Sequence, residues 1–178
     1  MLVSPAPNKQ NSQIPHRRST QDCHTCSRRL DQNNSLLIGL PQKSIHKLQL
    51  VQNAVARLIS GIKKKDHITP VLHQLHWLPV QYRILYKVLL LTFKSLNGEG
   101  PEYLTEHLNY YVPARPLRSA TDKKLCVPVT SYVETGKRAF GVRATCEWNK
   151  LPFTLRNKDS TASFKKALKT HFFLQAFK

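Results

Sequence analysis

The sequence is poor in acidic residues and in long apolar runs. Its 178 residues include 10 Asp and Glu against 28 Lys and Arg, which gives a formal net charge of +18 at pH 7. The longest aliphatic run, Val88–Leu91, is far shorter than the roughly 20 residues that span a bilayer. The N-terminal segment lacks the apolar stretch of a secretory signal. We therefore expect no transmembrane segment, no membrane partner and an intracellular protein, nuclear or cytoplasmic.

The few acidic residues are also scattered. No glutamate stands beside an aspartate, and the aspartates are isolated at Asp22, Asp31, Asp66, Asp122 and Asp159. Two-metal phosphoryl transfer needs paired carboxylates. The sequence also has no Gly-rich phosphate loop, no GxSxG and no HExxH. We therefore predict that the chain is not an enzyme and that it uses no metal, no cofactor and no small-molecule substrate.

Histidines and cysteines offer weak metal-site alternatives. His73 and His76 lie three residues apart, so their rings could share a helix face, but no carboxylate lies nearby and surface or capping roles are favoured. Cys23 and Cys26 form a CxxC pair, and a zinc site would need two further ligands at suitable spacing. Reduced thiols are the favoured interpretation of the pair, with zinc and a disulfide as alternatives.

The excess of positive charge favours a polyanionic partner. Residues 136–178 carry 10 basic and 2 acidic residues, and so supply +8 of the +18. A charge of this size exceeds what solubility requires, and it favours the phosphates of RNA or DNA. Tyr82 and Tyr86 alternate with basic residues, which suits base stacking; alternatively they rim the helix core. The candidate phosphate contacts are Lys63, Lys64, Lys65, Arg83, Lys87, Arg115, Arg118, Lys165, Lys166 and Lys169.

Apolar residues recur at helical spacing through most of the chain. We predict helices over 44–62, over 69–75, from Pro79 to Leu96, and from an N-cap at Ser160 or Thr161 onward. The predicted apolar face of the helix over 44–62 consists of Ile45, Leu48, Val51, Val55, Leu58, Ile59 and Ile62. That of the helix from Pro79 to Leu96 consists of Val80, Ile84, Leu85, Val88, Leu89, Phe93 and Leu96. That of the C-terminal helix consists of Phe164, Leu168 and Phe172, with Gln175 as a further candidate. The sequence therefore predicts a mainly α-helical domain over 34–178.

Other features refine this prediction. A minor strand or hairpin is expected near 124–133, where β-branched residues alternate and Pro128 restricts pairing to an edge. Residues 1–33 are polar, basic and without apolar periodicity, so we predict a disordered tail. Trp77, Pro79 and Trp148 are the expected structural anchors, with Trp77 in the angle between the helix over 69–75 and the helix from Pro79, and Trp148 in a second local core.

An ordered set of short motifs resembles the C-terminal region of LINE-type non-LTR retrotransposon reverse transcriptases. The motifs HITPVL, LHWLPV, LLLTFK and GPEYL are followed by PLRS, RAF, WNKLP and SFKKALKTHFF, and are preceded by NSLLIGLP and KLQLVQNAVARL. Together they cover roughly residues 33–177 in order. The resemblance implies a region that follows the polymerase palm and helps to hold template RNA or target DNA.

The resemblance leaves three interpretations open. The chain is a non-catalytic, nucleic-acid-associated fragment of such a protein. Alternatively, it is an interaction module whose helix at 44–62 docks on the absent thumb and palm and exposes an apolar stripe when alone. A truncated element copy without selected function is the third interpretation. The partners implied are RNA or DNA phosphates and the upstream polymerase domains.

Overall fold

Helices build most of the described structure. The computed structural model describes residues 31–113, 115, 122–129 and 139–178. In chain order the elements are η1 (Asn34–Leu37), α2 (Gln42–Ser60), α3 (Thr69–Gln74), α4 (Val80–Leu96), α5 (Glu102–Thr105), α6 (Phe140–Lys150), α7 (Phe153–Arg156) and α8 (Thr161–Ala176). The predicted mainly α-helical fold is confirmed. The predicted tail lies outside these ranges up to residue 30, and Asp31 already pairs with Arg83, ahead of the predicted boundary.

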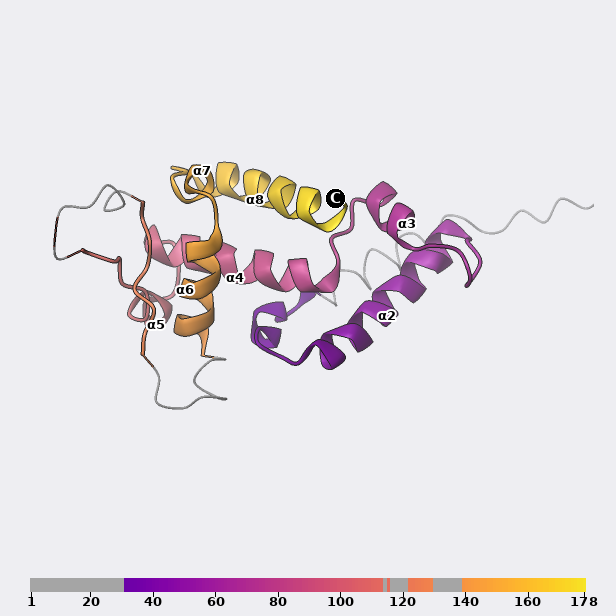
Figure 1. Cartoon of the computed structure of the whole chain (residues 1–178), viewed down its shortest axis with the longest axis horizontal. Coiled ribbons are helices and arrows are strands. Elements are labelled where there is room, and N and C mark those ends of the chain that lie inside the picture. The colour runs from indigo at the N-terminus through magenta and orange to yellow at the C-terminus, as the bar shows by residue number, and fades with distance from the viewer. Residues whose placement is uncertain (1–30, 114, 116–121, 130–138) are drawn as a thin grey trace, which may run out of the picture.

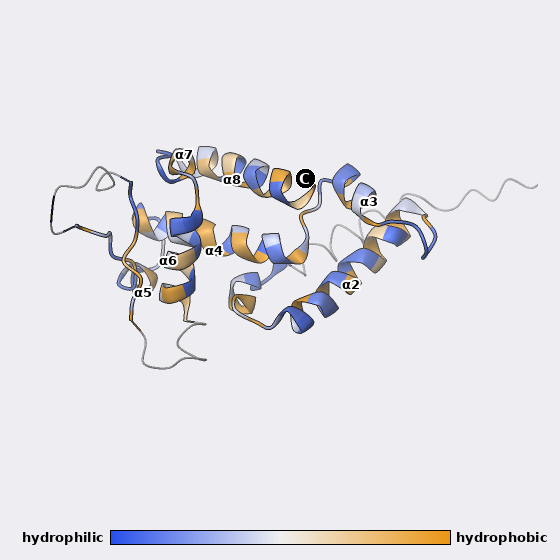
Figure 2. Ribbon diagram, in the orientation of Figure 1, coloured by the Kyte–Doolittle hydropathy of each residue, from blue (hydrophilic) through white to orange (hydrophobic). Residues whose placement is uncertain are grey.

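Helix α4 lies at the centre of the fold and contacts α2, α5, α6, α8 and η1 (Figure 1). Its buried apolar side chains are Val80, Ile84, Val88, Leu89 and Phe93. Pro79 precedes its first turn, and Asn97 and Gly98 end it, with Gly98 at a φ of 73°. The apolar spacing therefore predicted both the position and the face of this helix. In Figure 2, apolar residues lie along much of α4, whereas α2 is largely hydrophilic toward the viewer.

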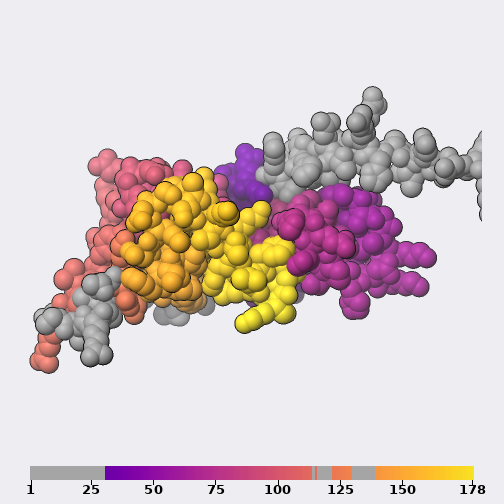
Figure 3. Space-filling view, turned by 90° about the horizontal axis from the view of Figure 1, so that it is seen from above, coloured from indigo at the N-terminus to yellow at the C-terminus, as the bar shows by residue number. Residues whose placement is uncertain are grey.

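Helix α8 lies along α4 and completes the main core. Ser160 is its N-cap, and the Ser160 hydroxyl accepts a hydrogen bond of 3.2 Å from the Ser163 N–H. The predicted face of Phe164, Leu168 and Phe172 is buried, whereas Gln175 is exposed. Figure 3 shows α8 crossing one face of the molecule between the α6–α7 region and α3.

Aromatic rings fill the centre of this core. The Phe93 ring of α4 stacks on the Phe164 ring of α8, with centroids 4.2 Å apart. Trp148 of α6 lies 5.9 Å from Phe164 and is 1 % exposed. The neighbouring Glu147 does not enter the core, because its carboxylate pairs with Lys150 at 2.8 Å. Trp148 is therefore the anchor that the sequence predicted.

The Trp-Leu-Pro corner before α4 is held by side chains of α2. The Leu78 carbonyl accepts hydrogen bonds from Gln52 Nε2 at 2.9 Å and from Arg83 Nε at 3.0 Å. The Val80 N–H donates to Gln49 Oε1 at 2.8 Å. Buried backbone groups need such partners, so these two glutamines fix α2 against the start of α4.

The predicted apolar face of α2 is therefore wrong in part. Ile45 is buried, but Val51 and Leu58 are 50 % and 77 % exposed. The fully buried positions are instead Gln52 and Ala56. The inward face of α2 carries the amides of Gln49 and Gln52, which bond to the backbone of the Trp-Leu-Pro corner. Because apolar periodicity does not count these polar residues, it predicted a buried face that is rotated about the helix axis from the observed one.

Trp77 occupies a second, smaller core. It is 8 % exposed and clusters with Ala56 of α2 and with Val71 and Leu72 of α3. The Arg83 guanidinium lies 5.7 Å from its ring centroid. Trp77 is thus buried as predicted, but it packs between α2 and α3 rather than in the angle between α3 and α4.

The segment where a strand was predicted is held by one short backbone pairing and by side chains of α6. Within 122–129 the structure shows one antiparallel bridge, between Tyr110 and Leu125, and no longer strand; residues 130–133 lie outside the described ranges. Asn149 brackets Leu125, donating to its carbonyl and accepting from its N–H, both at 2.8 Å. Trp148 Nε1 donates to the Lys123 carbonyl at 2.9 Å. On one side the segment therefore pairs with 109–111, where the Tyr111 N–H donates to the Lys124 carbonyl at 2.9 Å and the Cys126 N–H to the Asn109 carbonyl at 2.8 Å, and on the other side the Trp-Asn pair of α6 holds it.

Candidate nucleic-acid interface

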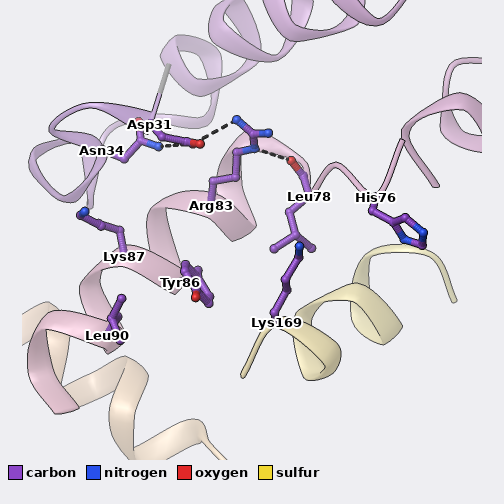
Figure 4. Close-up of a pocket in the computed structure, with 9 residues that line it drawn as sticks. All are labelled: Asp31, Asn34, His76, Leu78, Arg83, Tyr86, Lys87, Leu90 and Lys169. Atoms are coloured by element: carbon purple, nitrogen blue, oxygen red, sulfur yellow. Dashed lines mark hydrogen bonds and ion pairs between the residues drawn. The ribbon is translucent and has the colours of Figure 1, made fainter. Parts of the chain in front are cut away.

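A cavity of about 350 Å³ lies where η1, the 76–78 turn, α4 and α8 meet (Figure 4). Basic, aromatic and polar side chains line it: Asp31, Asn34, His76, Leu78, Arg83, Tyr86, Lys87, Leu90 and Lys169. Three of these, Arg83, Lys87 and Lys169, are candidates that the sequence named. With three cations and one carboxylate, its formal charge is 3 − 1 = +2. We call this site the α4–α8 cavity.

Arg83 forms the base of the cavity and is mostly engaged by the protein itself. Its Nη1 pairs with Asp31 Oδ1 at 3.0 Å, its Nε donates to the Leu78 carbonyl, and its guanidinium faces Trp77. Burial lowers the pKa of Arg83, and the Asp31 charge and hydrogen bond oppose that shift. The Arg83 side chain is 12 % exposed. Arg83 therefore shapes the cavity more than it offers a charge to solvent.

Lys87 and Lys169 are the cations that the cavity presents to a ligand. Lys87 extends from α4, and Lys169 reaches the same cavity from α8 (Figure 4). Both residues are exposed, and neither makes an ion pair with any residue that the structure describes. Two ammonium groups from separate helices thus line one cavity, and Figure 4 shows them on opposite sides of it, the Lys87 nitrogen toward η1 and the Lys169 nitrogen beside Leu78.

Rings and left-handed backbone conformations lie at the same cavity. Tyr86 is half-buried, and burial raises the pKa of its hydroxyl. His76 lines the cavity at a φ of 52°, and Asn33, next to the lining residue Asn34, has a φ of 58°. Asparagine and histidine adopt this left-handed conformation more readily than most residues other than glycine. Asn34 is 3 % exposed, and its Oδ1 accepts no hydrogen bond from the described part of the chain.

The remaining sequence candidates are dispersed. Lys63, Lys64 and Lys65 are exposed in the turn after α2, where the Lys63 N–H donates to Asp66 Oδ2 at 2.9 Å. Lys165 and Lys166 are exposed on α8, and Lys166 lines a different, more apolar hollow beside α7. The structure therefore separates Lys166 from Lys169, although the sequence placed them on one helix face. Arg115 is exposed, and Arg118 lies outside the described residues.

Metal ligands do not gather in the described ranges. No group of three or more His, Cys, Asp or Glu side chains comes together there. The His73 and His76 rings instead lie 5.0 and 5.6 Å from the Phe173 ring of α8. Cys126 and Cys146 are free thiols, and Cys23 and Cys26 lie outside the described residues. None of the helices in these ranges has the length and apolar character needed to cross a membrane.

The comparisons with known proteins identify no relative of this chain. No family model, no curated protein and no solved structure matches the chain. The geometry of the α4–α8 cavity and the charge of the chain therefore carry the functional argument. The sequence named Arg83, Lys87 and Lys169 by charge and Tyr86 by its aromatic spacing, but it held no signal for Asn34 as a lining residue.

Proposed function

We propose that this chain is a non-catalytic nucleic-acid-binding module that holds RNA or DNA by its phosphates. One observation carries the proposal: Lys87 of α4 and Lys169 of α8, which make no ion pair with any residue described, line a single cavity together with Arg83. The formal net charge of +18 supports it, because such a charge attracts polyanions over long range. Lys165, one turn before Lys169 on α8, is also exposed and adds to the charge of this helix.

We further propose that the module is the post-polymerase region of a non-LTR retrotransposon reverse transcriptase. The ordered motifs carry this family proposal, and the helical fold is compatible with it. In such a protein the α4–α8 cavity would help to hold template RNA or target DNA near the polymerase. The chain would not itself extend a primer, since its aspartates are isolated in sequence.

A fluorescence-anisotropy titration at several salt concentrations tests the binding proposal. Short RNA, single-stranded DNA and duplex DNA serve as labelled probes. With about 4–6 phosphate contacts, log affinity should fall with log salt at a slope of about −3 to −5. Affinity should differ little among sequences, because phosphate contacts carry no base information.

Lysine variants locate the binding surface. The double variant Lys87→Gln with Lys169→Gln should weaken binding to a single strand, and it should flatten the salt slope by about 0.7 for each phosphate that is no longer neutralised. Lys166→Gln is the matched control, because it makes the same substitution on the same helix at a residue outside the cavity. Glutamine keeps the helix propensity of lysine, so the fold should persist. Equal effects of the double variant and the control would remove the cavity from the proposal.

A second function is favoured by the apolar stripe on α2. Leu50, Val51 and Leu58 are 53 %, 50 % and 77 % exposed along this helix. Such a stripe suits docking against another protein surface, here the polymerase domains of a full-length element protein. Concentration-dependent self-association without nucleic-acid binding, abolished by Leu58→Gln, would favour this docking role over the first proposal.

A further inference from the structure

The α4–α8 cavity differs from a flat phosphate-binding surface because it is a hollow lined in part by two rings, those of Tyr86 and His76. Its volume of about 350 Å³ lies near the lower end of the ~300–1,000 Å³ typical of small-ligand pockets. Tyr86 and His76 line it together with Leu78 and Leu90, and the two lysines lie at its edge (Figure 4). The cavity therefore offers two rings and two leucine side chains beside the Arg83–Asp31 ion pair at its base, with Lys87 and Lys169 as further cations.

This combination matches the chemistry of one nucleotide. A base is a planar ring that stacks on aromatic side chains, and its phosphate pairs with ammonium groups. A base in a duplex is stacked between its neighbours and cannot enter such a cavity. An unpaired base can turn away from its strand and enter, while its flanking phosphates stay near Lys87 and Lys169.

We propose that the α4–α8 cavity accepts a single unpaired nucleotide of an RNA or DNA strand, so that the chain prefers single strands to duplexes. This proposal rests on the proposed nucleic-acid-binding function and adds to it the strandedness of the ligand. Tyr86 and His76 supply the stacking surface, and Lys87 and Lys169 bind the phosphates on either side.

One further feature of the cavity supports this role. Asn34 lines the cavity, its Nδ2 donates to Asp31 Oδ1 at 3.0 Å, and its buried Oδ1 lacks a donor among the residues described. The exocyclic amino group of a base would supply that donor if the Asn34 amide turned toward the cavity, a turn that would break the hydrogen bond to Asp31.

The test compares a labelled single strand with a duplex of the same length and sequence. Wild-type protein should bind the single strand more tightly. Tyr86→Leu removes the ring and should weaken single-strand binding by about five- to 100-fold, the range expected for loss of one stacked base, with little change for the duplex. Tyr86→Phe keeps the ring and should bind as the wild type does. A 2-aminopurine base in the strand should change its fluorescence on binding to wild type and Tyr86→Phe, but not to Tyr86→Leu.

Because Tyr86 also packs against the main core, a second variant guards against a folding defect. His76→Asn removes a ring at a position where asparagine tolerates the left-handed backbone, and it should also reduce the single-strand preference. Circular dichroism checks that each variant is folded. Competition by adenosine monophosphate tests whether the ligand of the cavity is a free nucleotide or a nucleotide within a strand. We expect adenosine monophosphate to displace the strand only at millimolar concentration.

The possible results separate this proposal from the one on which it rests. Equal affinity for single strand and duplex, with a salt slope that still depends on Lys87 and Lys169, would overturn the nucleotide cavity and leave the phosphate-binding function standing. If the Tyr86→Leu variant is folded and loses affinity for single strand and duplex by the same factor, the nucleotide cavity is likewise overturned and the phosphate-binding function still stands. Displacement of the strand by micromolar adenosine monophosphate would assign the cavity to a free nucleotide instead. No binding of any nucleic acid would overturn both proposals.

Discussion

Replacing Trp148 by alanine tests the packing of the main core. The Trp148 side chain is 1 % exposed, contacts the Phe164 ring, and donates from Nε1 to the Lys123 carbonyl at 2.9 Å. Truncating a buried tryptophan to alanine costs about 3–5 kcal/mol, and removal of the hydrogen bond adds about 1 kcal/mol. Total stabilities of domains are about 5–15 kcal/mol, so Trp148→Ala should remove a large share of the stability.

Thermal unfolding followed by circular dichroism measures this effect. For a domain of this size, 1 kcal/mol corresponds to roughly 2–4 °C, so the loss of about 4–6 kcal/mol should lower Tm by about 8–24 °C. Tyr103→Ala is the matched control, because Tyr103 is an aromatic residue that is 64 % exposed. Its Tm should change by about 1–2 °C. Trp77→Ala should also lower Tm by more than Tyr103→Ala does, since Trp77 is buried in the second core. A Tm shift for Trp148→Ala no larger than that of Tyr103→Ala would refute the described packing.

Three further predictions concern single positions. Gly100→Ala should lower the urea midpoint of unfolding, because the new Cβ would lie 2.7 Å from Ser95 Cα; an unchanged midpoint would contradict the close approach. Burial lowers the pKa of His171, so its stabilising contribution is present above the unfolded pKa of about 6.5 and is lost as pH falls through the lowered folded value. In the His171→Gln variant, Tm should therefore fall slightly less as the pH is lowered. A dependence of Tm on pH equal to that of the wild type would count against the partial burial of His171. Asp31→Asn should remove a negative charge from the cavity and tighten nucleic-acid binding at low salt, which anisotropy measures; weaker binding would show that the Asp31–Arg83 pair is needed to shape the site.

Helix α4 shows how far the sequence alone could predict the fold. Its apolar residues repeat at helical spacing, and proline and glycine mark its two ends. The N-cap Ser160 and the buried face of α8 were predictable for the same reason. These features are local, because each depends on residues within a few turns of one another.

The face of α2 could not be predicted in this way. Gln49 and Gln52 turn inward because the backbone at Leu78 and Val80 needs hydrogen-bond partners. That need arises only when α2 meets the corner, and apolar periodicity does not report it. The same limit applies to Trp77, whose burial was predictable but whose neighbours in α2 were not.

The candidate site was predicted in its residue types but not in its geometry. Charge identified Lys87, Lys166 and Lys169 alike, yet only Lys87 and Lys169 line the cavity. The cavity exists because α8 packs along α4, and that packing joins residues far apart in sequence. The dual role of Arg83, charged by type but held by Asp31 and Leu78, likewise follows from tertiary contacts.

Photocrosslinking tests the central claim, that nucleic acid binds at the α4–α8 cavity, most directly. A single strand carrying 4-thiouridine is bound to the protein and irradiated, and the crosslinked peptides are mapped by mass spectrometry. We predict adducts within residues 76–90 and 165–173, and their loss in the Lys87→Gln, Lys169→Gln double variant. Adducts confined to residues 63–65 or to the segment before Asp31, and unchanged in that variant, would contradict the account.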